Sequence, residues 1–311
     1  MATMDAVQIA EFGGPEVLQL KRLAIPEPRA GELLLKVRAA SVNPVDYKIR
    51  SGKYPAVQAD KLPYVLGRDA CGEVTKLGQG VTNFATGDAV YSMVRISGGG
   101  YAEYVILNEK DASRAPKTLD ATSAAAVPLA ALTAWQGLFR HGGLKPKQRV
   151  LIHGGSGGVG HFAIQFAKTR GAYVITTVSA QSLDFVLKLG ADEAIDFKKV
   201  RFETQVHDVD VVFDLIGGET QTRSWDVLKK GGIVVSTVAA PSEDEARRRG
   251  VRGTRYMVEE SGSELGEIAG LIDAGKVKPK VAKAFRLKEA AAAQTYLEQG
   301  NAQGKVVLAV E

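Results

Sequence analysis

The sequence predicts an α/β protein in which a β-rich domain, built from both ends of the chain, carries an inserted domain with a doubly wound parallel sheet. Two observations predict this fold. Short strand-like runs separated by glycine turns fill residues 5–120, and strands alternate with helices from about residue 150 to residue 260. A length of 311 residues also exceeds what one hydrophobic core usually serves. We expect domain parts at 1–122, 123–260 and 261–311.

The composition is that of an ordinary globular protein, with 45% hydrophobic residues, 24% charged residues and a net charge of +5. Cys71 is the only cysteine, so the chain can form no internal disulfide and no cysteine cluster for a structural zinc ion. Its apolar, glycine-flanked surroundings favour a buried residue over a reactive thiol. No apolar stretch approaches the roughly twenty residues of a membrane span. The first residues lack a signal-peptide pattern, and we expect a cytoplasmic protein.

The β-rich part is predicted from its short strands and glycine turns. The strand-like runs are 6–9, 17–20, 33–39, 72–77, 88–91 and 101–106. Many short strands with glycine turns between them indicate a small barrel or sandwich. Residues 124–139 are then apolar and small, which predicts a helix, and Pro128 is expected to break or kink it.

The inserted domain is organised around an apolar strand at 150–153, a glycine-rich turn and a helical run. Gly155, Gly157 and Gly160 have the spacing G-x-G-x-x-G. In such a turn one glycine permits the tight bend, one lets the backbone approach a pyrophosphate, and one lets helix and strand pack closely. The helix N-terminus then directs free N–H groups at the phosphates. Because a strand precedes the turn and a helix follows it, we favour a dinucleotide site over a plain strand-to-helix turn.

The rest of the inserted domain continues the alternation of strands and helices. Further strands are expected at 173–178, 194–197, 209–214, 232–237 and 255–258. The helix at 183–189 ends at Gly190. This alternation indicates right-handed crossovers and a mainly parallel sheet, and five or six strands is the count of a Rossmann domain. After it come a helix at 262–275, a strand at 281–285, a helix at 287–299 and a closing strand at 305–310, which need not belong to the nucleotide sheet.

The end of the second strand indicates which cofactor binds. NAD-specific Rossmann domains place an acidic residue there to bind the ribose 2′-hydroxyl. Here Ser179, Gln181 and Ser182 follow the strand, and no acid occurs before Asp184. Hydroxyl and amide donors suit a 2′-phosphate, so the sequence favours NADPH over NADH, although no Arg or Lys follows the strand directly.

Several segments, in the same order over essentially the whole chain, resemble the zinc-free quinone oxidoreductase branch of the medium-chain dehydrogenase/reductase superfamily. They are the Asn-Pro-x-Asp motif in 41–52, the Pro-x-x-x-Gly-x-Asp-x-x-Gly-x-Val motif in 63–74, the helix at 129–135, the glycine-rich turn, and residues 188–192, 214–218 and 304–308. The resemblance implies a GroES-like catalytic domain formed by both termini, an inserted Rossmann domain and a homodimer.

The same resemblance bears on zinc. Arg68 stands where the zinc-dependent relatives have a histidine ligand, and their catalytic cysteine corresponds to Val45 or Asp46. A catalytic zinc ion wants about three protein ligands and an open position. The four histidines, His141, His153, His161 and His207, lie in or beyond the nucleotide half, and a hydrogen-bonded structural role is favoured for His153. We therefore expect no metal.

Without a Lewis acid, hydride addition to a conjugated acceptor is easier than alcohol oxidation, because charge delocalises onto the carbonyl oxygen. We therefore expect an NADPH-dependent reductase of quinones or α,β-unsaturated carbonyls. One alternative is an alkenal or 2-enoyl-thioester reductase. Another is a cofactor-binding structural or RNA-binding protein, for which the arginines at 247–249, 252 and 255 are the relevant feature. We favour a solvated loop for these arginines, and neither a membrane nor a nucleic-acid partner.

The resemblance implies four catalytic candidates, and each has a plainer interpretation. Asn43 lies near the nicotinamide and the substrate carbonyl in the family, or is a turn residue before Pro44. Asp46 is a proton donor or, as we favour, the cap of a helix beginning near Tyr47. Tyr47 or Tyr64 offers a phenol to the substrate oxygen or, as we favour, lines an apolar pocket.

The resemblance and the glycine motif together imply the cofactor contacts. They are Asn43, Thr133, Gly155, Ser156, Gly157, Gly158, Val159, Gly160, Ser179, Gln181, Ser182, Leu215, Ile216, Gly217, Val238, Ala239, Met257, Val258 and Lys305. Plain core packing explains Val238, Ala239, Met257 and Val258 equally well. The family often has a phosphate-contacting tyrosine where this chain has Phe197, so that hydroxyl is missing.

Overall fold

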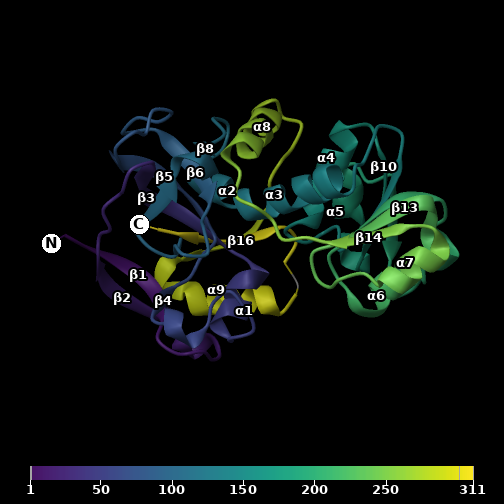
Figure 1. Ribbon diagram of the computed structural model, residues 1–311, viewed down its shortest axis with the longest axis horizontal. Helices are drawn as coiled ribbons and strands as arrows, with labels where there is room; N and C mark the ends of the chain where they lie inside the picture. The colour runs from purple at the N-terminus through teal and green to yellow at the C-terminus, as the bar shows by residue number, and fades with distance from the viewer. Residues whose placement is uncertain (1, 301, 311) are drawn as a thin grey trace. The chain divides into compact units, whose positions relative to one another are not determined.

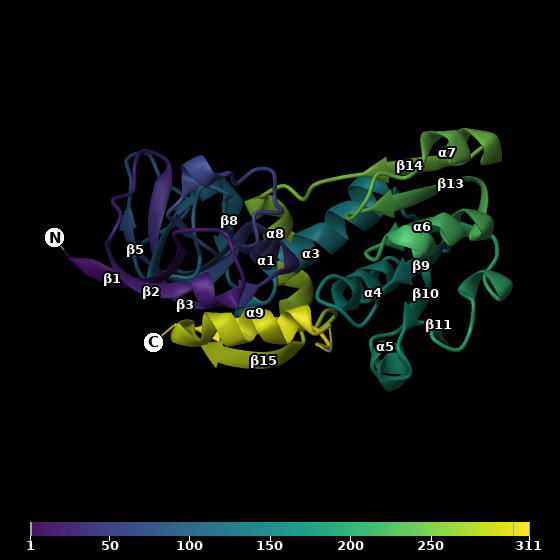
Figure 2. The same ribbon diagram turned by 90° about the horizontal axis from the view of Figure 1, so that it is seen from below.

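The computed structural model describes residues 2–300 and 302–310, which form two compact units (Figures 1 and 2). The first unit comprises Met1–Leu129, Glu260–Gly275 and Pro279–Glu311, and the second comprises Ala130–Glu259 and Lys276–Lys278. Both ends of the chain, purple and yellow in Figure 1, therefore belong to the same unit. The expected insertion of one domain into another is confirmed.

The first unit is built mainly from antiparallel strands. A three-stranded sheet has the order β2-β1-β4, and a larger sheet has the order β15-β16-β3-β5-β6-β8, with β7 also paired to β3. Their bounds are β1 (Thr3–Ile9), β2 (Gln19–Ala24), β3 (Glu32–Val42), β4 (Tyr64–Val65), β5 (Asp69–Leu77), β6 (Ala89–Met93), β7 (Tyr104–Asn108), β8 (Ala112–Arg114), β15 (Val281–Arg286) and β16 (Lys305–Ala309). The closing strand β16 pairs antiparallel with β3, with Val306 opposite Val42. This pairing joins the two ends of the chain in one sheet.

The core of the first unit is aliphatic and centres on β3. Leu33, Leu35 and Val37 are at most 2% exposed and pack in one cluster with residues of β5, β7 and β16. The helices of this unit are α1 (Pro44–Arg50), α2 (Ala121–Ala125), α8 (Gly262–Asp273) and α9 (Ala290–Glu298). The helix α3 (Pro128–Trp135) carries the chain into the second unit and continues as a π-helix at Gln136–His141. Because α2 ends at Ala125 and α3 begins at Pro128, the expected break at the proline is confirmed.

The second unit contains a six-stranded sheet in the order β11-β10-β9-β12-β13-β14, and every neighbouring pair is parallel. The elements are β9 (Arg149–His153), α4 (Gly160–Thr169), β10 (Tyr173–Val178), α5 (Leu183–Lys188), β11 (Glu193–Asp196), β12 (Val209–Asp214), α6 (Gly218–Ser224), β13 (Leu228–Ser236), α7 (Glu243–Arg249) and β14 (Arg252–Arg255). This is the Rossmann topology. Its strand order reverses at β9 and β12, so ligands are expected beyond the carboxyl ends of the strands there.

Three elements differ from the sequence-based expectation. The last strand of the parallel sheet is β14 at Arg252–Arg255 and not 255–258, because this edge strand is polar and mostly exposed and carries no apolar pattern to mark it. The strand expected at 101–106 is β7 at Tyr104–Asn108. The helix expected near Tyr47 begins three residues earlier, at Pro44, where proline is well tolerated in the first turn.

Among the described residues, no helix has the length and apolar character that a membrane crossing requires.

Candidate functional site

The glycine loop, residues 154–160 between β9 and α4, contains two glycines that the fold itself requires. A Cβ atom added to Gly155 would lie 2.1 Å from Thr176 Oγ1 of β10. A Cβ atom added to Gly160 would lie 2.2 Å from the carbonyl oxygen of Gly154. Both positions are closed to any side chain, because the loop packs against its own backbone and against β10.

Gly157 is different. A Cβ atom there would meet only the carbonyl oxygen of Gly154, at an ordinary contact distance of 3.5 Å. The fold therefore does not need glycine at this position, and the space beside Gly157 is open. This is the clearance expected where a backbone approaches a pyrophosphate. Ser156, Gly158 and Val159 are half-buried in the same loop, so the residues present fit a dinucleotide.

Exposed apolar side chains follow three strands of the parallel sheet at the same carboxyl edge. Ile216, Val238 and Met257 come after β12, β13 and β14 and are 54%, 40% and 53% exposed. We call these three residues the apolar shelf. Large exposed apolar side chains gathered at one edge of a sheet mark a ligand site more often than isolated ones do. Two of them border glycines: a Cβ on Gly154 would lie 3.1 Å from Ile216, and one on Gly217 would lie 3.1 Å from Val238.

Asp214, the last residue of β12, fixes the backbone that carries this shelf. Its carboxylate is fully buried and accepts hydrogen bonds from the backbone N–H groups of Ile216 at 3.0 Å and Gly217 at 2.8 Å. The other oxygen accepts hydrogen bonds from Gln221 Nε2 and Ser236 Oγ, both at 2.9 Å. Sequence reasoning gave Asp214 no role, although an acid that ends a buried strand before Gly-Gly is a detectable signal.

The residues expected at the ribose end of the cofactor follow β10. Ser179 is half-buried, Gln181 is exposed, and Ser182 is 2% exposed, with its N–H donated to the carbonyl of Ser179. On the neighbouring strand β11, the chain continues into Phe197, which is 56% exposed and donates its N–H to the carbonyl of Val178. The exposed Lys198 and Lys199 come next, and sequence reasoning left Lys199 out.

The remaining cofactor candidates of the second unit lie on α3 or after the strands. Thr133 is 6% exposed, and its carbonyl accepts a hydrogen bond from Tyr256 Oη. Leu215 and Val258 are half-buried, and Ala239 is exposed with its carbonyl bonded to Gln221. Ala239 is therefore accessible at this edge of the sheet, whereas Thr133 is part of the interior of the domain.

His153 is a buried structural residue, as expected. Its ring nitrogens lie 2.9 Å from Thr177 Oγ1 and 2.9 Å from Ser224 Oγ, so it ties β9 to β10 and α6. Burial lowers the pKa of His153 to about 4, which keeps the ring neutral. Among residues 2–300 and 302–310, no three side chains of His, Cys, Asp or Glu are grouped in a way that could hold a metal ion.

The first unit contains a buried polar cluster formed by Ser41, Asn43, Asp69 and Lys305. Asp69 accepts hydrogen bonds from Ser41 Oγ at 2.5 Å and from Asn43 Nδ2 at 2.8 Å, and its second oxygen accepts the N–H of Leu129 at 2.7 Å. Lys305 Nζ donates to the carbonyl of Val42 at 3.1 Å and to Asn43 Oδ1, and lies 4.0 Å from Asp69. All four side chains are at most 3% exposed.

This cluster fixes the Asn43 amide at both ends. Its oxygen accepts from Lys305, and its nitrogen donates to Asp69 at 2.8 Å and makes two longer contacts of 3.5 Å to the carbonyl and hydroxyl oxygens of Ser41. Burial lowers the pKa of Lys305 from its ordinary value, and the carboxylates of Asp69 and Asp46 oppose that change. The ammonium of Lys305 is therefore engaged within the first unit. Sequence reasoning named Asn43 and Lys305 but missed Asp69 and Ser41, which hold them.

Asp46 lies at the third position of α1 and is not the N-cap, which is Asn43. Its Oδ2 accepts the backbone N–H of Asn43 at 2.8 Å and the hydroxyl of Tyr101 at 3.0 Å. Its Oδ1 is buried and has no hydrogen-bond partner in the described part of the chain. Desolvation by burial raises the pKa of Asp46 to about 7. Asp46 thus helps to cap the helix, and it is also a carboxyl group that can hold a proton near neutral pH.

Asp46→Asn is expected to remove a pH dependence of stability. Folding raises the pKa of Asp46 from 3.8 to about 7, so the folded chain holds a proton that the unfolded chain releases. The free energy of unfolding therefore falls as the pH rises through this window, by up to about 1.4 kcal/mol per pH unit. Chemical unfolding of both proteins from pH 4 to pH 8 should show that the stability of the wild type relative to the variant falls across this range, because other titrating groups such as His153 contribute equally to both proteins. Parallel curves would contradict it.

The two candidate tyrosines differ in what their hydroxyls contact. Tyr64 Oη donates to the carbonyl of Ile96 at 2.6 Å, and burial raises the pKa of Tyr64 to about 12. Tyr47 is half-buried on α1, and partial burial together with Glu298 raises its pKa. Its hydroxyl has no hydrogen bond to another described residue. Tyr47 is therefore the freer of the two phenols.

Three arginines of the cluster end a helix and the other two, Arg252 and Arg255, lie on β14, so none of them lies in the expected loop. Arg247, Arg248 and Arg249 end α7, where cations suit the helix dipole. Each pairs with an acid: Arg247 with Asp244, Arg248 with Glu245, and Arg249 with both Glu245 and Asp226. The positive charge of these three arginines is thus matched locally, which weakens the case for a nucleic-acid surface.

Two family models match the chain. The alcohol dehydrogenase GroES-like domain matches residues 29–117, and a model described as zinc-binding dehydrogenase matches residues 189–308. The first range lies within the β-rich unit. The second covers most of the parallel sheet and extends into the closing strand.

Individual proteins match over nearly the whole chain. The NADPH-dependent alkenal/one oxidoreductase of Arabidopsis thaliana is 38% identical, over 98% of this chain and 79% of its own. The quinone oxidoreductase from Coxiella burnetii is 37% identical, with a TM-score of 0.93 over 100% of both chains. The Escherichia coli quinone oxidoreductase complexed with NADPH is 31% identical, with a TM-score of 0.89 over 98% of this chain and 99% of the other.

These similarities agree with the fold and with the dinucleotide loop, and they make the protein an oxidoreductase that depends on a nicotinamide cofactor. The chain belongs to the zinc-free quinone oxidoreductase branch of the medium-chain dehydrogenase/reductase superfamily.

Proposed function

We propose that this protein is an NADPH-dependent reductase that acts on quinones or α,β-unsaturated carbonyls without zinc. The observation that carries the proposal is the combination, at one edge of the second unit, of open space at Gly157 and the exposed apolar shelf of Ile216, Val238 and Met257. The glycine loop suits the pyrophosphate, and the shelf suits the flat nicotinamide ring. When bound, the cofactor supplies the hydride, and the chain supplies position and electrostatics.

The residues of the second unit would bind and orient the cofactor. The N-terminus of α4 directs backbone N–H groups at the phosphates. Asp214 holds the backbone of Ile216 and Gly217 through two hydrogen bonds, which fixes one side of the nicotinamide site. The apolar shelf excludes water beside the ring, which limits loss of the hydride to solvent.

The preference for NADPH is supported by the groups that follow β10 and β11. Ser179 and Gln181 offer neutral donors, and the exposed Lys198 and Lys199 supply positive charge after the adjacent strand. No acidic residue stands at the end of β10 to bind a ribose 2′-hydroxyl. The Arabidopsis relative is named as NADPH-dependent, in agreement with this preference.

Ser179→Asp is expected to reverse the cofactor preference. The new carboxylate would repel a 2′-phosphate and accept a hydrogen bond from a 2′-hydroxyl, so kcat/KM for NADPH should fall about tenfold or more while that for NADH rises. Leu187→Asp adds the same charge at an exposed position of α5 and should change neither value by more than about twofold. If the wild type already prefers NADH, the argument from Ser179 fails.

On the substrate side, the proposal needs hydrogen bonding and no metal. We assign three groups to orienting the carbonyl and to its proton supply. They are the Asn43 amide, which beyond its bond to Asp69 makes only long contacts of 3.5 Å to Ser41, the phenol of Tyr47 and the carboxyl of Asp46. The hydroxyl of Tyr64 already donates to Ile96, so we assign Tyr64 to lining. The absence of any grouped metal-ligand set among the described residues supports the zinc-free mechanism.

No single substitution of these four residues is expected to abolish turnover. Each group acts by positioning, so Asn43→Ala, Asp46→Asn, Tyr47→Phe and Tyr64→Phe should each leave measurable kcat/KM with NADPH and a quinone. The activity of the wild-type enzyme under the same conditions is the reference. A loss of about a million-fold in any one variant is the signature of a lost nucleophile and would overturn the positioning mechanism.

The acceptor class is tested by NADPH oxidation with 1,4-benzoquinone, 9,10-phenanthrenequinone, a 2-alkenal and a 2-enoyl thioester, compared side by side. We expect turnover with at least one quinone or enone. The second candidate, an alkenal reductase, is favoured by similarity to the alkenal/one oxidoreductase of Arabidopsis thaliana and would show the highest kcat/KM with the 2-alkenal. Cofactor binding without turnover of any acceptor would favour the structural or RNA-binding alternative.

The cytoplasmic location and the homodimer stay predictions.

A further inference from the structure

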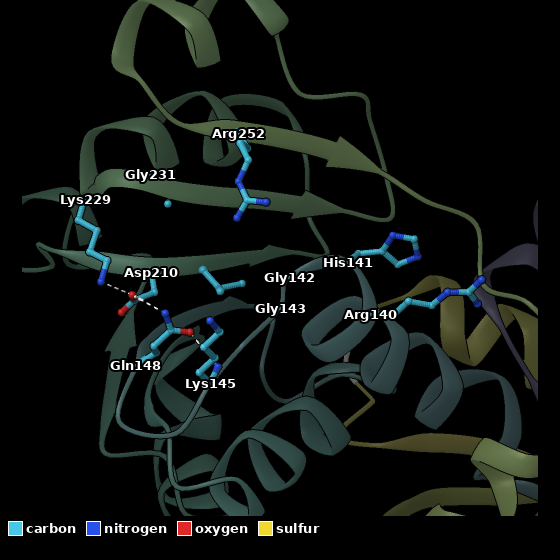
Figure 3. Close-up of a pocket in the computed structure, with 12 residues that line it drawn as sticks. Arg140, His141, Gly142, Gly143, Lys145, Gln148, Asp210, Lys229, Gly231 and Arg252 are labelled. Atoms are coloured by element: carbon cyan, nitrogen blue, oxygen red, sulfur yellow. Dashed lines mark hydrogen bonds and ion pairs between the residues drawn. The ribbon is translucent and has the colours of Figure 1, made fainter.

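A hollow lies in the second unit at the amino ends of strands of the parallel sheet, whereas the glycine loop follows their carboxyl ends. Figure 3 shows the residues that line it. It is bordered by the first residues of β12, β13 and β14 and by the turn that follows the π-helix. Its volume is about 340 Å³, near the lower limit of small-molecule sites. We call it the cationic pocket.

The side chains around this pocket are mainly basic. They are Arg140, His141, Lys145, Lys229 and Arg252, with Asp210 as the one acid among the lining residues. A hollow lined by one sign of charge concentrates its field and attracts ligands of the opposite sign. The lining therefore predicts that the pocket binds an anion, provided that Asp210 does not cancel the positive charge of the basic side chains.

Asp210 is already satisfied by its neighbours. It is 7% exposed and accepts hydrogen bonds from Gln148 Nε2 and from the backbone N–H of Arg149, both at 2.9 Å. It also pairs with Lys229, at the left of Figure 3. The charge of Asp210 is therefore balanced by Lys229, and the other cations of the pocket do not depend on it.

Two cations remain uncompensated. Among the described residues, neither Lys145 nor Arg252 has a carboxylate within ion-pair distance, whereas Arg140 pairs with Glu259 at 2.7 Å in an exposed and therefore weak pair. Figure 3 shows Arg252 extending from β14 toward the centre of the pocket, above Gly142 and Gly143. A planar guanidinium in this position can make two parallel hydrogen bonds to one phosphate group.

Two glycines, Gly143 and Gly231, line the pocket beside these cations. Gly143 and Gly231 have positive φ angles of 60° and 79°, and a Cβ added to either would meet nothing within 4 Å. Open space therefore lies beside both backbones. Both glycines line the pocket together with Lys145 and Arg252, so no side chain from either glycine position fills it.

We propose that the cationic pocket binds a small anion of two or more charges that carries phosphate, either free or as a phosphate monoester. Lys145 and Arg252 are the residues that hold it. The site is separate from the glycine loop, because it lies at the amino ends of the strands and the loop lies at their carboxyl ends. The proposal does not depend on which acceptor the enzyme reduces.

Isothermal titration of the full chain with inorganic pyrophosphate tests the proposal, with NADP+ present in excess to fill the cofactor site and with constant ionic strength. We expect one site per chain with a Kd below about 1 mM. The double variant Lys145→Gln/Arg252→Gln should weaken binding at least about tenfold. Inorganic phosphate and glycerol 3-phosphate, titrated in the same way, separate a free anion from a monoester as the preferred ligand.

Lys230→Gln is the matched control, because it removes the same charge next to Lys229 on β13 but lies outside the pocket. Its Kd should stay within about twofold of the wild type. Thermal unfolding curves establish that each variant is folded. If the double variant does not fold, the two single variants are titrated in its place. The proposal is overturned if pyrophosphate does not bind saturably, or if Lys230→Gln weakens binding as much as the pocket variants do.

Discussion

Asp69→Asn is expected to lower the free energy of unfolding by about 3–5 kcal/mol, the largest stability effect that we predict. The wild-type carboxylate accepts three hydrogen bonds, from Ser41, Asn43 and the backbone of Leu129, in a fully buried position. In the variant, the NH2 group of the asparagine would face at least one of the groups that donate a hydrogen bond to the wild-type carboxylate. The substitution would also remove the negative charge 4.0 Å from Lys305, whose ammonium is 3% exposed.

Urea unfolding at pH 7 measures this effect. The matched control is Glu27→Gln, which also replaces a carboxylate by an amide but breaks an exposed pair with Lys76. Exposed pairs contribute little, so the control should change stability by less than about 1 kcal/mol. Equal and small effects of the two substitutions would show that the buried polar cluster does not hold the first unit together.

Gly157→Ala and Gly160→Ala are expected to separate cofactor binding from folding. At Gly157 the added methyl group fits the free protein, 3.5 Å from the nearest atom, but occupies the open space beside the loop. NADPH affinity should therefore fall about tenfold or more with an unchanged melting temperature. At Gly160 the methyl group would lie 2.2 Å from a backbone oxygen, so stability should fall by about 1–3 kcal/mol or more, and cofactor binding should fall with it.

Gly270→Ala on α8 is the control for both variants, because a Cβ there meets nothing within 4 Å. Alanine in a helix interior should raise stability slightly, by up to about 1 kcal/mol, and leave cofactor binding unchanged. Melting curves and fluorescence titration with NADPH give the two readouts. Normal cofactor binding by Gly157→Ala would mean that the glycine loop does not approach the pyrophosphate as we propose.

Most strands of the parallel sheet were predictable because they are buried on both faces and rich in valine and isoleucine, and because helical runs alternate with them. β12, for example, is buried at all six positions. The glycine loop was predictable because its spacing follows from the chemistry of one turn. The insertion of one domain into another followed from the return of strand-like runs after residue 280.

Pairings between distant residues were not predictable in the same way. Lys305 and Asn43 are 262 residues apart, and no local pattern links them to each other or to Asp69. β14 is polar on an open edge, so its residues carry no period that marks a strand. The cationic pocket likewise assembles Lys145, Lys229 and Arg252 from three separate segments. In each case the fold brings together residues whose proximity the sequence does not encode locally.

The central claim is that hydride from the nicotinamide cofactor reaches a conjugated acceptor with no metal in the protein. The most direct test is NADPH oxidation with 9,10-phenanthrenequinone and a 2-alkenal by enzyme that has been treated with a strong chelator and shown to contain no zinc. We predict full activity, with unchanged kcat/KM, for the acceptor that the untreated enzyme uses. Loss of activity on chelation and its return with added zinc would contradict the account.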